Sequence, residues 1–160
     1  MAGFVAAVLV IIVAVLACVA ALPEGRGRSV SRRRLAGVAL LALLPTLVLL
    51  YLPPPEFGDP QVWMLALVAG VVGIARGALV GLRVDHGKGK VLMSRAPEGL
   101  WVTIAILLLM LLDVLAEPVG RLGSPFVGTV EMVMVLLTFS LLGRNAAILV
   151  RSRDAPQHDL

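Results

Sequence analysis

Long apolar runs alternate with short polar connections along the whole chain. Residues 2–22 (AGFVAAVLVIIVAVLACVAAL) and residues 35–52 (LAGVALLALLPTLVLLYL) contain no charged side chain. A helix needs about 20 consecutive apolar residues to cross the hydrocarbon core of a bilayer. The pattern predicts an all-α membrane protein, a bundle of five transmembrane helices over residues 3–22, 35–52, 61–82, 99–116 and 126–144.

Composition favours a membrane protein over a soluble one. Hydrophobic residues make up 59% of the 160 residues and charged residues 15%, whereas a soluble domain is usually about 45–50% apolar and about 25% charged. No segment long enough for a soluble domain remains between the predicted spans. We therefore expect a single integral membrane domain over residues 1–160, with a short cytoplasmic tail at 145–160.

The distribution of basic residues predicts the orientation of the chain. Of the 14 lysines and arginines, all but Arg76 and Arg121 fall in or beside the connections 23–34 and 83–98 and the C-terminal segment. Cytoplasmic loops of membrane proteins carry the excess of Lys and Arg. These three segments are therefore predicted to be cytoplasmic and the N-terminus to lie outside, in a multi-pass membrane protein.

The same loops account for the net charge of +4. The basic residues lie beside membrane spans and form no stripe interleaved with aromatic residues, which argues against a nucleic-acid partner. The expected environment is the lipid bilayer.

A ladder of glycines marks the third predicted span. Gly73, Gly77 and Gly81 are four residues apart, so they share one face of a helix, and Gly70 lies on its flank. Small residues in this arrangement let two helix backbones approach closely in a membrane. The glycine face is expected to pack against another helix of the same chain, or to form a seam with a membrane protein partner or a second copy.

Arg76 lies beside this glycine face, about two turns from the predicted cytoplasmic end of the span. An arginine within a membrane span is costly at the bilayer centre and less so near an end. Its long side chain can reach the headgroups. The alternative is a role inside the bundle, where Arg76 would hold an acidic partner or an anionic ligand.

Asp113 and Glu131 form, with Arg76, the candidate intramembrane polar site. The two acids are expected at similar depths near the outer surface, in antiparallel spans joined by a short loop. Carboxyl groups in a membrane are often functional, and a close pair could hold a proton or a cation. The alternatives are a structural ion-pair layer with Arg121, solvation by headgroups, or contact with a partner helix.

The connection 83–98 carries a glycine turn between partly alternating residues and could form a small hairpin on the inner surface. Its Gly-Lys-Gly sequence lacks the full phosphate-binding loop pattern, and adjacent Asp85 and His86 are weak evidence for a metal site. The single cysteine, Cys18, cannot form an intramolecular disulfide or a redox pair. No catalytic constellation or cofactor motif is present, so we expect neither an enzyme nor a bound cofactor or metal.

Residues 70–101 combine several short motifs with a glycine-rich span. They are, in order, Arg76-Gly77, Arg83-x-Asp85, a glycine turn at Gly87 and Gly89, Val91, Arg95 and a following span that opens with Trp101. This combination resembles the CcdC-like bacterial integral membrane proteins. The resemblance implies a small inner-membrane protein with several helices and, by the family's name, a link to cytochrome c maturation; it carries no catalytic residue onto this chain.

Taken together, these features predict a non-enzymatic polytopic inner-membrane protein that acts as an accessory or assembly component by packing with other membrane proteins. The alternative is a small transporter or membrane receptor that uses the intramembrane acidic site.

Overall fold

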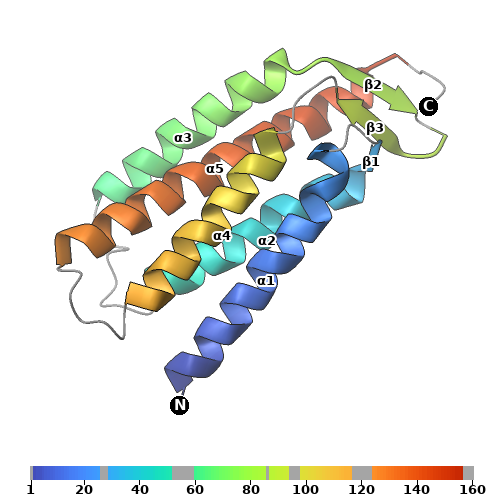
Figure 1. The fold of residues 1–160 in the computed structure, drawn as a ribbon. Coiled ribbons are helices and arrows are strands. Elements are labelled where there is room, and N and C mark those ends of the chain that lie inside the picture. The colour runs from blue at the N-terminus through green and yellow to red at the C-terminus, as the bar shows by residue number, and fades with distance from the viewer. Residues whose placement is uncertain are drawn as a thin grey trace.

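The computed structural model describes residues 2–25, 29–51, 60–85, 87–93, 98–116 and 124–156. Helices dominate the described part of the chain and alternate in direction, so that one end of the molecule carries a small sheet (Figure 1). The helices are α1 (Ala2–Gly25), α2 (Arg32–Tyr51), α3 (Pro60–Leu79), α4 (Glu98–Ala116) and α5 (Ser124–Asp154), and the strands are β1 (Val30–Ser31), β2 (Leu82–Asp85) and β3 (Lys90–Met93).

Two helical segments among the described residues are long and apolar enough to cross a membrane. They are Pro60–Leu79, which is the whole of α3, and Met132–Asp154 of α5. Shorter apolar helical segments cover Ile11–Pro23 and Glu98–Leu112. The structure therefore agrees with the predicted helical class, and the two long apolar segments suggest a membrane location.

Helix α5 is the centre of the helical packing. Its contacts with α3 are the most extensive of any pair of elements, and it also packs against α2 and α4. Helix α1 packs against α2 and α4 instead (Figure 1). The large apolar side chains of the main core come from α4 and α5, and small ones from α1 and α2 let the helices approach; they include Ile106, Met110, Met134, Leu141, Ala14, Ala21, Val38 and Ala42.

The contact between α3 and α5 is a seam of backbone against backbone. A Cβ added at Gly73 would collide with the carbonyl group of Ser140, and one at Gly77 would meet the carbonyl group of Arg144. Helix α5 contributes a glycine of its own, because a Cβ at Gly143 would collide with the carbonyl group of Gly70. At these points the two helices leave room for no more than a hydrogen atom.

The partner of the glycine face is therefore α5 of the same chain. Gly73 and Gly77 lie in the seam, and Gly70 contributes its backbone. Gly81 departs from the expected arrangement, because α3 ends at Leu79 and Gly81 follows the helix instead of extending its face. A second chain would have to use another surface of α3, since α5 already covers this one.

A buried polar contact joins α2 to α5. The hydroxyl groups of Thr46 and Thr138 lie 2.8 Å apart, and Thr46 also donates to the carbonyl oxygen of Ala42 at 3.2 Å. Both threonines are buried. Hydrogen bonds of this kind satisfy polar groups that neither lipid nor an apolar core could pair.

The three strands form an antiparallel sheet in the order β1-β3-β2. The hairpin expected within 83–98 is confirmed, with Val84 paired with Val91. Strand β1 was not predicted, because its two residues, Val30 and Ser31, are too few to show a strand period. Val30 also pairs with Val91, and this valine row packs on Leu35 and Ile148.

Helix α5 continues well beyond the predicted fifth span. Its 31 residues correspond to about 46 Å, against about 30 Å for the hydrocarbon core of a bilayer. Residues 145–154, which we expected to form a tail, belong to this helix. The sheet explains the extension, because it covers Ile148, which is fully buried outside the predicted span.

The seam between α3 and α5 can be tested with two alanine substitutions on one helix. Gly73→Ala is expected to lower the free energy of unfolding by about 1–3 kcal/mol, as overpacking does, because its Cβ would meet the backbone of Ser140. Gly70→Ala is the matched control, since its Cβ would find nothing within 4 Å. Thermal unfolding in detergent compares the two variants, and equal losses would contradict the seam.

Candidate functional site

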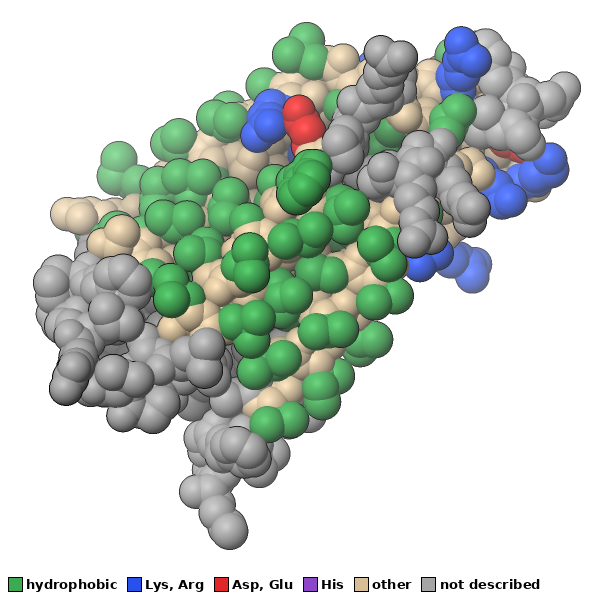
Figure 2. All heavy atoms as spheres, in the orientation of Figure 1, with side chains coloured by type: hydrophobic (Ala, Val, Ile, Leu, Met, Phe, Trp, Pro, Cys, Tyr) green, Lys and Arg blue, Asp and Glu red, His purple; other side chains and the backbone are tan. Residues whose placement is uncertain are grey.

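Charged side chains gather at the end of the molecule that carries the sheet, and apolar side chains cover the helices (Figure 2). This end brings together the last turns of α3 and α5 and the first turns of α2 and α4 (Figure 1). It is the part of the described structure where a ligand could meet several polar groups.

Arg76 is paired with Glu98. The Arg76 Nη2 atom lies 3.1 Å from the Glu98 Oε2 atom, and the two side chains are 48% and 45% exposed. The pair joins the last turn of α3 to the first turn of α4, where each charge also suits the dipole of its own helix. Arg76 therefore has an acidic partner, Glu98, which is one of the roles considered for it from the sequence. Half-exposed ion pairs of this kind contribute at most about 1 kcal/mol to the free energy of unfolding.

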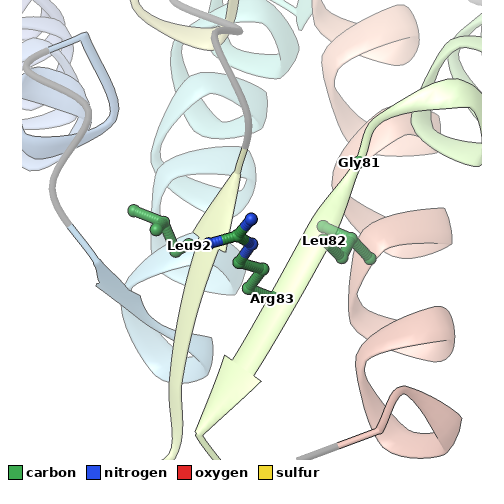
Figure 3. Close-up of a pocket in the computed structure, with 4 residues that line it drawn as sticks. All are labelled: Gly81, Leu82, Arg83 and Leu92. Carbon is green, nitrogen blue, oxygen red and sulfur yellow. The ribbon is translucent and has the colours of Figure 1, made fainter. Parts of the chain in front are cut away.

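One hollow adjoins this ion pair, and a second hollow shares Gly81 with it. The first, of about 370 Å³, is lined by Arg76, Glu98, Leu79, Val80 and Gly81. The second, of about 240 Å³, is lined by Gly81 and by three residues of the hairpin, Leu82, Arg83 and Leu92 (Figure 3). In the second hollow the Arg83 side chain extends from β2 toward β3, where its register partner is Leu92 (Figure 3).

Arg34 supplies hydrogen-bond donors to backbone carbonyls near the C-terminal end of α1. Proline lacks the backbone N–H that would bond to the carbonyl four residues earlier, so Pro23 leaves the carbonyl of Val19 without its helical donor. Arg34 Nη2 donates to that oxygen at 3.3 Å, and Arg34 Nε donates to the carbonyl oxygen of Ala20 at 3.0 Å. We expected the first span to end before Pro23, yet α1 continues to Gly25, and this compensation explains how.

Arg151 performs the same task for α3. Its Nη1 atom donates to the carbonyl oxygens of Gly77 and Val80, at 2.9 and 2.8 Å. The last carbonyls of a helix have no partners within the helix, so α5 caps the helix that it packs against. Arg32 ties α2 to the end of α5 in a similar way, donating from Nη2 to the carbonyl oxygen of Ser152 at 2.6 Å.

Two polar residues are buried where α5 passes under the sheet. Asn145 donates from Nδ2 to the carbonyl oxygen of Leu35 at 3.1 Å and accepts from Arg144 Nη1 at 3.2 Å. Arg144 Nη2 also lies 4.0 Å from the Met93 Sδ atom. The two side chains join α5 to α2 and to β3 and are almost inaccessible to solvent.

Asp85 belongs to the turn of the hairpin. Its Oδ1 atom accepts a hydrogen bond from the backbone N–H of Lys88 at 3.0 Å, and its Oδ2 atom lies 3.6 Å from Lys88 Nζ. The backbone hydrogen bond, helped by the Lys88 charge, holds the pKa of Asp85 below its usual value. Gly89 has a φ of 59°, which favours glycine. Asp85 therefore stabilises the turn, and its neighbour His86 lies outside the described residues.

The predicted intramembrane polar site is divided between two ends of the bundle. Asp113 lies near the end of α4 and Glu131 near the start of α5, and their side chains are outside the described part of the structure. Arg76 pairs with Glu98 at the opposite end of α4. Residues 98 and 113 are separated by about 22 Å along that helix. Arg76 therefore does not complete a site with Asp113 and Glu131.

Several residues that organise this end were not singled out from the sequence. Arg34 and Arg151 appeared only as basic residues beside spans, although each binds backbone carbonyls. Pro23 followed closely by an arginine run is the one available signal, because the proline frees a carbonyl that a long cationic side chain can reach. Within the described residues no group of three His, Cys, Asp or Glu side chains could hold a metal ion.

Comparison with known proteins adds no relative. No protein-family model, no curated protein and no solved structure matches this chain. The resemblance of residues 70–101 to the CcdC-like proteins stays a prediction.

The role of Arg34 at the end of α1 can be tested by a double-mutant cycle. Arg34→Gln is expected to lower the free energy of unfolding by about 1–2 kcal/mol, because it leaves the carbonyl of Val19 without a donor. In a Pro23→Ala background the backbone N–H at position 23 would bond that carbonyl, so the same substitution should cost less. Arg33→Gln, at an exposed neighbour, is the control, and an equal cost in both backgrounds would refute the compensation.

Proposed function

We propose that the chain is a five-span protein of a bacterial inner membrane, with its N-terminus outside and its C-terminus in the cytoplasm. The alternating helix directions place the connections α1–α2 and α3–α4 and the end of α5 at one end of the bundle (Figure 1). Described basic residues concentrate there, in agreement with the bias of cytoplasmic loops toward Lys and Arg.

The main support for membrane insertion is the exposed apolar surface of α3. Eight large apolar side chains of this helix are about half exposed or more, from 49% for Trp63 and Val72 to 87% for Leu79; the others are Met64, Leu67, Val68, Val71 and Ile74. An apolar surface of this kind is unusual on a soluble monomer. Lipid, or another membrane helix, would cover it without cost.

The proposed role is that of a non-enzymatic accessory or assembly component that packs with other membrane proteins. Three of its described cations at the sheet end support the fold: Arg34 and Arg151 bind backbone carbonyls, and Arg76 binds Glu98. Because α5 occupies the glycine face of α3, the contact with a partner is proposed at the outward apolar surface of α3. A link to cytochrome c maturation is supported by the sequence resemblance alone.

The topology has a direct test with reporter fusions. A reporter inserted at residue 57 is expected to read out as periplasmic, and one at residue 90, the first residue of β3, as cytoplasmic. The two positions lie in successive connections, which must face opposite sides if α3 spans the membrane. The reverse result would invert the orientation, and the same side for both would exclude a spanning α3.

The accessory role is tested by photo-crosslinking in the host membrane. A photoreactive residue at Leu67, which is 68% exposed on α3, is expected to give a discrete protein adduct, whereas one at Leu108, 60% exposed on α4, serves as the matched control. The double variant Asp113→Asn and Glu131→Gln should keep the adduct. No adduct from Leu67, together with an intact double variant that has lost an ion or ligand response, would favour a transporter or receptor instead.

A further inference from the structure

We propose that the two hollows around Gly81 form one binding site for an anionic glycerophospholipid, with Arg83 as the residue that holds the phosphate. The site goes beyond the accessory role, but it rests on the proposed insertion in a membrane. The site would combine the exposed charge of Arg83, the neighbouring ion pair and the position of both hollows at the end of α3.

Arg83 supplies an exposed cation that forms no ion pair with another described residue. It is exposed, and the ion pairs within the described part of the chain are Arg76–Glu98 and Lys88–Asp85, neither of which includes it. The guanidinium lines a hollow with Leu82 and Leu92 (Figure 3). An arginine between apolar side chains suits a phosphate attached to a hydrocarbon chain, because the guanidinium binds two phosphate oxygens together while the leucines contact the glycerol and the first methylenes.

The neighbouring hollow extends the site toward a second arginine. This hollow is lined by Arg76 and Glu98 and shares Gly81 with the hollow that contains Arg83. Both members of the Arg76–Glu98 ion pair are about half exposed, so the Arg76 guanidinium is accessible from outside the protein. Its charge is therefore available to a second oxygen of the headgroup, in competition with Glu98.

If α3 spans a membrane, both hollows lie near the boundary between lipid and water. They lie just where α3 ends at Leu79 and the polar hairpin begins. Leu79 lines one hollow and is 87% exposed, and Ile74, about one turn earlier on the helix, is 50% exposed. A lipid whose phosphate is bound at Arg83 would therefore have apolar protein surface on the membrane side for its acyl chains.

Native mass spectrometry of the full chain released from nanodiscs tests the site. The nanodiscs contain phosphatidylglycerol and phosphatidylcholine with identical acyl chains, so that only the headgroup differs. The parent protein is expected to retain phosphatidylglycerol preferentially. Arg83→Gln should reduce that retention at least about tenfold, the effect of losing a charged hydrogen-bonding group. Lys90→Gln, which removes an exposed charge from the same sheet outside both hollows, should retain the lipid like the parent.

A further variant tests the hollow that contains Arg76 and Glu98, and it is expected to change lipid retention in the opposite direction. Glu98→Gln removes the carboxylate that competes for Arg76, so it is expected to raise the retention of phosphatidylglycerol. Unchanged or reduced retention would exclude Arg76 from the site. This variant keeps the side-chain shape, and its thermal unfolding profile should match that of the parent.

The remaining outcomes separate the site from the proposed function. Equal losses for Arg83→Gln and Lys90→Gln would reduce the effect to general surface charge and overturn the site. The same holds if the parent shows no preference for phosphatidylglycerol while remaining in the nanodisc. A chain that does not enter nanodiscs at all would overturn membrane insertion, and the lipid site with it.

Discussion

The fold depends on the close approach of α3 and α5. At Gly73, Gly77 and Gly143 the two backbones come together with no side chain between them, so dispersion contacts between the backbones hold the two helices together. Because α5 also contacts α2 and α4, placing α3 against it fixes the position of α3 in the whole bundle. The seam also decides which side chains of α3 point outward, and these form its exposed apolar surface.

The arginines at the sheet end connect helix ends to one another. Arg34 binds the carbonyls near Pro23, Arg151 binds those at the end of α3, and Arg32 binds the end of α5. Helix ends expose carbonyls that need donors, and a cation near a helix C-terminus is also favoured by the dipole. The excess of arginine in these connections therefore closes the bundle through contacts between segments that are distant in the sequence.

The three-stranded sheet packs over this end of the molecule. Its valine row buries Ile148 and Leu35, which allows α5 to continue as a helix for about three turns past the predicted membrane span. The same strands leave Arg83 exposed on the other side, beside the last residues of α3. An inward apolar face and an outward charged face thus follow from the alternation along β2 and β3, and the proposed lipid site lies beside that outward face.

The sequence by itself determined the helical segments, the hairpin at 83–98 and the small residues that let α3 approach another helix. Each of these depends on local properties: the length of an apolar run, a glycine turn, or a spacing of four residues. Only the tertiary structure decided that α5 fills the glycine face, that Glu98 receives Arg76, that β1 joins the sheet and that α1 continues past Pro23. These outcomes depend on groups far apart in the chain, such as Arg151 and Gly77, which are separated by 74 residues. Local patterns carry no information about such pairs, because the free energy of each contact depends on how the helices pack around it.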